Sequence, residues 1–225
     1  MLYFGTIEDR NDPKQMGRVR VRVFGVHSAD KINDIPTASL PWAPVMNPTT
    51  TPGTSGLGQI PFLVPGSWVI VQFLDRELQS PIVMGTVHGF PNAKPNSENG
   101  FADPTGTFPR RTAESDIARR ARGTNEIEKQ SVGSEPADPY SAKYPYNHVF
   151  HSESGHMIEM DDTPGHERVQ VYHRTGAFIE IHPDGAMVIH SGAHYNSSQK
   201  LEINVTDNAS INVGGNLNAL VEGTT

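Results

Sequence analysis

Residues 201–224 read LEINVTDN, ASINVGGN and LNALVEGT when they are set in three consecutive rows of eight. Apolar residues occupy the first, third and fifth places of each row, and the seventh place holds Asp207, Gly215 or Gly223. The nine apolar positions are Leu201, Ile203, Val205, Ala209, Ile211, Val213, Leu217, Ala219 and Val221. A repeat of fixed period is typical of architectures in which short strand-and-turn units stack along an axis.

Each row predicts a five-residue strand followed by a three-residue turn. Such a strand is only ~17 Å long at ~3.3 Å per residue, so one strand per coil cannot enclose an apolar interior. Three chains that contribute one row each would complete a coil, with the nine apolar side chains facing a shared axis. A monomer would leave both the apolar stripe and the strand edges exposed. The rows therefore predict an intertwined trimeric β-helix, and the alternative is an ordinary β-meander whose strands happen to lie eight residues apart.

The first ninety residues predict a different β-structure, a small barrel. Candidate strands at 2–7, 17–25, 67–74 and 81–87 are separated by turn-forming residues, as the chain's 21 Gly and 18 Pro favour. In the second strand Arg and Val alternate, so Val19, Val21 and Val23 share one face and Arg18, Arg20 and Arg22 the other. Four or five short strands in this length fit an OB-fold barrel over residues 1–90. Residues 43–66 are too long for a hairpin turn and predict a surface loop suited to contacts with another protein.

The strand pattern fades over residues 91–145, which predict an extended linker with at most one short helix. Strands resume at 148–151, 156–160, 168–172 and 177–181, where we expect a meander of exposed ribbons and no second compact domain. Residues 146–225 would thus hold this meander and, from about 201, the start of the trimeric β-helix. The expected fold class is all-β throughout.

The bulk composition excludes several classes of protein. A net charge of −7 weighs against nucleic acid as the main partner, because phosphate binding needs an excess of Lys and Arg. The absence of cysteine excludes disulfides and thiolate metal sites. The first residues lack the basic and apolar regions of a signal peptide, and no stretch approaches the ~20 apolar residues of a membrane helix. We therefore expect a soluble protein that has no cleaved signal.

Several blocks along the chain carry a family resemblance. They are Glu8-Asp9-Arg10 with Asp12-Pro13 and Gly17–Val23; Ile35-Pro36-Thr37 with Leu40-Pro41-Trp42; Gly100–Gly106 with Pro109-Arg110-Arg111; Tyr144-Pro145-Tyr146; Glu153–His156; and Asp161–Gly165 with Glu167-Arg168. With these blocks the chain resembles the central spike (tail-associated lysozyme) proteins of T-even-like contractile-tailed phages, and more distantly the VgrG spikes of type VI secretion. The resemblance implies an OB barrel, a middle lysozyme domain and a C-terminal trimeric β-helix with octad repeats.

The chain departs from that pattern where relatives hold the lysozyme. Only about thirty residues, Thr112 to Lys143, separate the Pro-Arg-Arg block from the Tyr-Pro-Tyr block. A lysozyme needs a cleft with two placed carboxylates on a folded domain, which so short a segment cannot build. We therefore expect no lysozyme activity. VgrG proteins carry their hub region ahead of the barrel, whereas this chain begins at the barrel, so a separate hub protein is expected above it.

Three candidate sites have weaker support in the sequence. Arg18, Arg20 and Arg22 could bind single-stranded nucleic acid, but a face paired with Glu8, Asp9 and Asp12 is the favoured interpretation. A hydrolase could use Ser154 and His156 with Glu159, Asp161 and Asp162, but these acids are expected to be solvated on a turn and a strand. A three-fold metal site could draw on histidines that we expect to be exposed: His148, His151, His156, His166, His173, His182, His190 and His194.

The resulting hypothesis is a homotrimeric structural spike of a phage tail baseplate, located in the virion. It would act by puncturing the cell envelope and would have no catalytic residues, metal or cofactor. Its expected partners are a hub protein above the barrels and a tip protein below, but not nucleic acid. The alternatives are a VgrG-like spike of a type VI or other contractile injection system, and a polysaccharide-degrading tailspike. Activity on peptidoglycan or capsular glycans would distinguish the last from a structural spike.

Overall fold

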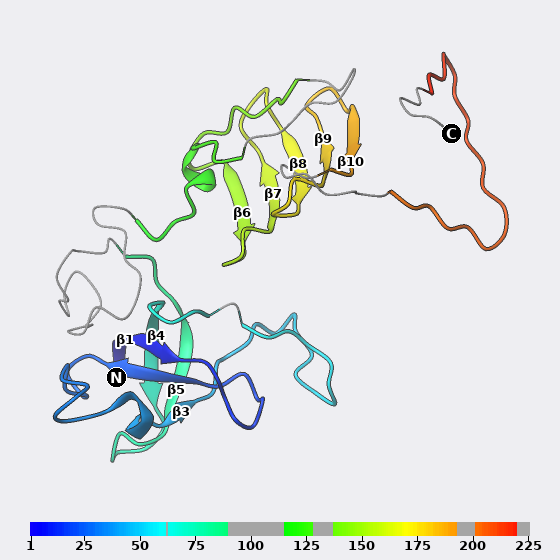
Figure 1. Ribbon diagram of the computed structural model, residues 1–225. Coiled ribbons are helices and arrows are strands. Elements are labelled where there is room, and N and C mark those ends of the chain that lie inside the picture. Colours follow the sequence, from blue (N-terminus) through cyan, green and yellow to red (C-terminus); the bar gives the residue numbers. More distant parts are fainter. Residues whose placement is uncertain (62, 90–114, 128–136, 193–200, 220–225) are drawn as a thin grey trace.

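The computed structural model describes residues 1–61, 63–89, 115–127, 137–192 and 201–219, and in these ranges the secondary structure is almost entirely β (Figure 1). Ten strands form two five-stranded antiparallel sheets, the first from residues 2–86 and the second from residues 147–190. Two short 3-10 helices, Thr37–Ser39 and Arg120–Arg122, complete the regular structure of the described residues. Among these residues no helix is long or apolar enough to span a membrane. The expected all-β fold class is confirmed.

The first sheet closes into the expected OB barrel. Its strands are β1 (Leu2–Asp9), β2 (Val19–Val23), β3 (Trp42–Ala43), β4 (Trp68–Phe73) and β5 (Pro81–Thr86), in the order β3-β2-β1-β4-β5. The chain just after β3 closes the circle against β5 through a parallel bridge between Val45 and Val83. There the Val83 amide donates to the Pro44 carbonyl and the Met46 amide to the Val83 carbonyl, each over 2.9 Å. This bridge pairs part of the free edge that an open five-stranded sheet would expose.

The barrel interior follows from the alternation of Arg and Val in β2. Val19, Val21 and Val23 are at most 3% exposed and pack with Ile7, Val69, Val71 and Val83 in one apolar cluster. Each buried Val or Ile contributes about 1.5–3 kcal/mol relative to an exposed one, so burial of this cluster stabilises the barrel. The predicted inward face of β2 is therefore confirmed.

The arginine face of β2 differs from the expectation in one respect. Arg18 pairs with Asp12 over 2.6 Å and Arg22 with Glu8 over 2.7 Å, so the predicted acidic partners are present. Arg22, however, is 1% exposed, because it also donates to the Ser28 and Ile35 carbonyls of the loop that covers it. Burial would raise the pKa of the Glu8 carboxyl, but the Arg22 guanidinium together with Thr37 and Lys31 holds that pKa below its usual value. Arg20 lies over the Trp42 ring, 4.6 Å from its centroid.

The second sheet is a meander in which each strand pairs with the next. Its strands are β6 (Asn147–His151), β7 (Met157–Asp161), β8 (Arg168–Tyr172), β9 (Phe178–Ile181) and β10 (Met187–His190). Each turn between them contains a glycine with positive φ, at positions 155, 165, 176 and 185, a conformation that other residues adopt at a cost. The strands β6–β9 lie at the four positions predicted from the sequence, and β10 is a fifth strand that was not predicted.

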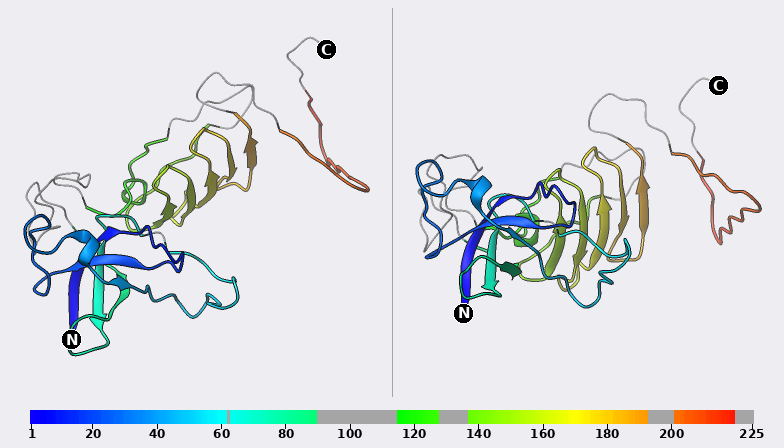
Figure 2. Two further views of the ribbon diagram at one scale, coloured as in Figure 1. Left: turned by 60° about the horizontal axis from the view of Figure 1, so that its bottom comes forward. Right: turned by 90° about the horizontal axis from the view of Figure 1, so that it is seen from below.

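The expectation of exposed ribbons is wrong for one face of this sheet. Met157, Tyr172, Phe178 and Val188 pack there with Ile127 in a second apolar cluster, because the segments 115–127 and 137–146 cover that face. Figure 2 shows the five strands side by side in both views.

Candidate functional site

The residues predicted to form a trimer core lie exposed in the single chain. Residues 201–219 contain no strand, and every one of them is exposed, with Ile203 at 80% and Ile211 at 81%. Figure 1 shows these residues as an extended run separate from both sheets. The chain alone therefore does not bring Leu201, Ile203, Val205, Ala209, Ile211, Val213, Leu217 and Ala219 together, while Val221 lies outside the described residues. Their common burial remains a prediction about several chains.

The outer face of the second sheet is a large exposed apolar surface. Nine apolar side chains project from it, each between 38% and 66% exposed. We call this surface the apolar face, and its members are Phe150, Ile158, Met160, Val169, Val171, Ile179, Ile181, Met187 and Ile189. Single exposed apolar residues are common, but a contiguous group of this kind usually marks an interface.

Strand register arranges the apolar face in two ladders that cross the sheet. One ladder contains Phe150, Ile158, Val171, Ile179 and Ile189, each directly opposite the next. The other begins at His148 and continues through Met160, Val169, Ile181 and Met187. Directly opposed side chains lie within about 5.5 Å of one another, so the ladders leave no polar gap between neighbouring strands.

Sequence reasoning missed the apolar face, although its signal was present. Pairs of apolar residues separated by one polar residue occur at 158/160, 169/171 and 179/181, and Met187 and Ile189 flank the buried Val188 at the same spacing. The same spacing recurs at 203/205 and 211/213 in the octad rows. The alternating pattern thus begins at β7, more than forty residues before the octad rows that start at Leu201.

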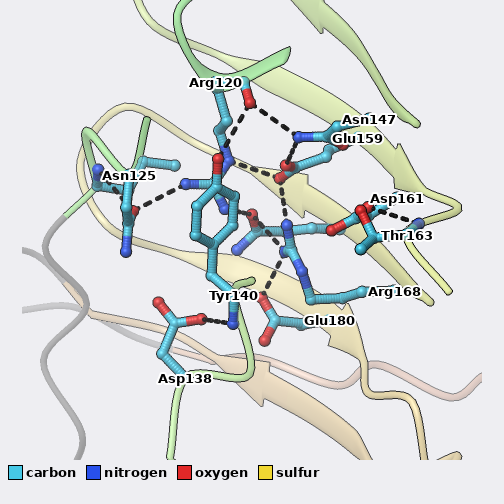
Figure 3. Close-up of polar contacts among 12 residues, drawn as sticks. Arg120, Asn125, Asp138, Tyr140, Asn147, Glu159, Asp161, Thr163, Arg168 and Glu180 are labelled. Atoms are coloured by element: carbon cyan, nitrogen blue, oxygen red, sulfur yellow. Dashed lines mark hydrogen bonds and ion pairs between the residues drawn. The ribbon is translucent and has the colours of Figure 1, made fainter. Parts of the chain in front are cut away.

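The reverse face of the sheet holds a group of buried charges, shown in Figure 3. We call it the ionic cluster: Arg120, Glu159, Arg168, Gln170 and Glu180, each at most 2% exposed. Arg120 Nε donates to Glu159 Oε2 over 2.6 Å and its Nη2 to Gln170 Oε1 over 3.1 Å. Arg168 pairs with Glu159 over 2.8 Å and with Glu180 over 3.2 Å. Two guanidinium groups therefore face two carboxylates within the ionic cluster.

Polar and aromatic neighbours complete the ionic cluster. Asn147 Nδ2 donates to the Arg120 carbonyl over 3.0 Å and to Glu159 Oε1 over 2.7 Å. The Tyr140 hydroxyl donates to the same carbonyl over 3.0 Å, and its ring centroid lies 4.1 Å from Arg120 Cζ. Burial raises the pKa of the Tyr140 hydroxyl to about 12, so it remains a donor at physiological pH.

Opposing effects set the ionisation of the cluster. Burial alone would raise the pKa of the Glu159 carboxyl, but the positive charges of Arg120 and Arg168 outweigh it and hold that pKa below its usual value. Burial likewise would lower the pKa of Arg168, whereas Glu159 and Glu180 raise it. Both groups are therefore charged at neutral pH.

The lowered pKa of Glu159 predicts that the second sheet loses stability in acid. Because the folded pKa lies below the ordinary value of 4.5, the stabilisation is complete above that pH and is lost as the pH falls through the folded pKa. We expect the urea midpoint of the sheet to be flat from pH 7 to about pH 5 and to fall below about pH 4. Glu159→Gln should be less stable at pH 7 and decline less in acid. An equal decline in the variant would contradict this assignment.

The weaker candidate sites are not brought together. Glu159 and Asp161 are 0% and 2% exposed, which corrects the expectation that they are solvated, and Glu159 is held by two arginines. Ser154 and His156 lie in the β6–β7 turn, where the Ser154 hydroxyl contacts the hydroxyl of Ser152 over 3.3 Å.

The histidines are also dispersed, with one departure from the expected exposure. His182 is 9% exposed and pairs with Glu180 over 3.1 Å, because it lies at the covered face. His156 and His190 are half-buried, and His148, His151, His166 and His173 are exposed, whereas His194 lies outside the described residues. Within the described ranges no group of three His, Asp or Glu side chains is placed to hold a metal ion.

Comparisons with known proteins identify the family of this chain. The family model of the Gp5 N-terminal OB domain matches residues 25–169. Protein Gp5 of Vibrio phage KVP40 is 34% identical over 97% of this chain and 62% of its own length. The pre-baseplate central spike protein Gp5 of Enterobacteria phage T4 is 44% identical over 48% of this chain and 20% of its own length. The chain thus spans less than two thirds of the length of either relative.

Proposed function

This chain belongs to the Gp5 family, whose members carry the Gp5 N-terminal OB domain, and from that membership we propose that it is the central spike of a contractile phage tail baseplate. The T4 relative is named for that role, and the KVP40 relative aligns over nearly the whole of this chain. The protein would be located in the tail baseplate of the virion.

The observation that carries the proposal is the exposed apolar face of β6–β10. The sheet has buried charges on its covered face and nine exposed apolar side chains on its open face. An open face of this kind is suited to contact with another subunit. Three copies around an axis would bury three such faces against one another, since closed symmetry satisfies every copy alike. The octad rows from Leu201 to Val221 would continue the same interior toward the C-terminal end. The spike would therefore be a homotrimer with a β-helical shaft.

The mechanical role follows from that arrangement. Strands from three chains that share one interior can separate only by exposing the apolar face of every copy. A shaft of this kind resists compression along its axis and suits a device driven through a cell envelope. We propose that the barrels lie at the hub end, with residues 43–66 as contacts for a separate hub protein, and that a tip protein follows the shaft.

We also propose that the spike has no lysozyme activity. The described part of the segment between Thr112 and Lys143 lies against the second sheet, where Arg120 is inserted among the buried charges. That segment contributes to the core of the sheet and is too short for a separate catalytic domain. Among the described residues the Ser154 hydroxyl contacts Ser152, and Glu159 is paired with Arg120 and Arg168.

The proposal predicts that the chain is an essential part of the phage tail. Quantitative mass spectrometry of purified tails should find three copies of the chain per tail. Phage in which the gene carries an early stop codon should yield particles without assembled baseplates, and the intact gene supplied in trans should restore them. Complete baseplates that lack this chain would contradict the proposal.

A further inference from the structure

Segment 115–127 contacts both β-structures, although it belongs to neither sheet. At its N-terminal end the Asp116 amide donates to the Gly89 carbonyl over 2.9 Å, and the Gly89 amide donates to Asp116 Oδ2 over 2.7 Å. Gly89 lies three residues after β5 and close to the Trp68 ring of the barrel. A Cβ atom added at Gly89 would lie 3.8 Å from Trp68 Cδ2. This two-way contact attaches the segment to the barrel.

Four residues later the same segment is attached to the second sheet. Arg120 is fully buried and reaches Glu159 of β7 and Gln170 of β8, while its carbonyl accepts hydrogen bonds from Tyr140 and Asn147. Charge-assisted hydrogen bonds in a buried site fix geometry more tightly than exposed ones. Arg120 therefore anchors the segment to the sheet.

The backbone at and just after Arg120 forms a compact turn that folds back on the segment. The Gly123 amide donates to the Arg120 carbonyl over 3.0 Å, and the Thr124 amide to the Arg119 carbonyl over 3.1 Å. Arg122 Nε donates back to the Ile117 carbonyl over 3.2 Å. Asp116 and Arg120 are four residues apart, so even a fully extended chain between them spans no more than ~14 Å, and the two anchors lie close together.

We infer that residues 115–127 act as a clamp that fixes the barrel relative to the second sheet. The contacts of Asp116 with the barrel and of Arg120 with the second sheet connect the two structures through only five residues of the segment. A second contact, the Arg10–Glu153 pair, also joins the two bodies over 2.7 Å, but both side chains are exposed and such pairs are weak. In the proposed spike the clamp would transmit an axial push from barrel to shaft, and this consequence alone rests on the proposed function.

Single-molecule FRET within one chain tests the clamp directly. The chain has no cysteine, so Lys14→Cys in the barrel and Asp184→Cys in the β9–β10 turn, both exposed, would carry the dyes. A large excess of unlabelled chain ensures that at most one copy in an assembly is labelled. We expect one narrow FRET population in the otherwise unaltered chain and its loss, with a broad distribution, in Asp116→Ala.

Two matched variants separate the clamp from other causes. Asp116→Asn keeps an oxygen that accepts from the Gly89 amide and should retain the narrow population, as should Arg10→Ala. Unchanged circular dichroism in Asp116→Ala would show that both sheets remain folded. A narrow population in Asp116→Ala, or a broad one in the parent, would overturn the inference. A narrow population in a chain that is monomeric by mass would support the clamp and contradict the trimeric spike.

Discussion

Ile179→Asp should convert the assembled protein into folded monomers. Ile179 lies in the middle of one ladder of the apolar face, opposite Val171 and Ile189, and is 46% exposed in the single chain. The substitution therefore leaves the chain's own core intact but would place a carboxylate from every copy in the shared interior. An uncompensated buried charge costs about 3–5 kcal/mol, which raises the dissociation constant by a factor of about 100 or more per site. Light scattering across a dilution series would measure the effect.

Ile32→Asp is the matched control. Ile32 is 71% exposed in the barrel loop and lies off the apolar face, so the same change there should leave the mass unaltered. Val213→Asp would test the octad rows separately from the sheet, and we expect it to weaken assembly as well. If Ile179→Asp forms the same oligomer as the parent over the whole dilution series, the apolar face is not the subunit interface.

Glu159→Ala should be the most destabilising single change within one chain. Glu159 pairs with both Arg120 and Arg168 in a site closed to water, so its removal leaves two buried guanidinium groups without the carboxylate that they share. Breaking a buried pair by removing one partner costs about 3–5 kcal/mol. Urea unfolding of the second sheet, followed in the Ile179→Asp background to remove the effect of assembly, would measure the loss.

Glu153→Ala supplies the comparison for a carboxylate on the same sheet. Its side chain is 56% exposed and pairs with Arg10 at the surface, so we expect a change of less than about 1 kcal/mol. Equal effects of the two substitutions would mean that the ionic cluster contributes no more than a surface ion pair.

The barrel could be predicted from the sequence because its signals are local. Strict alternation in β2 places Val19, Val21 and Val23 on one face, and turn formers mark the ends of the strands. The burial of Arg22 was not predicted, since its carbonyl partners come from a loop without a regular pattern.

The second sheet shows where local patterns stop being sufficient. Its strands were predicted, but alternation alone does not say which face another segment covers. Arg120 meets Glu159 across 39 residues and Gln170 across 50, so only the folded chain reveals that the charged face is the buried one. The usual rule that apolar residues face inward would have predicted burial of the apolar face. In the single chain that face is exposed, and it would be buried only in the assembly that we propose.

Sedimentation equilibrium of the unmodified chain at micromolar concentration tests the trimer most directly. The apolar face and the octad rows predict a single species of three times the 24.6 kDa mass of one chain. That species should also resist dissociation by SDS without boiling. A stable species of 24.6 kDa under the same conditions would contradict the trimeric spike.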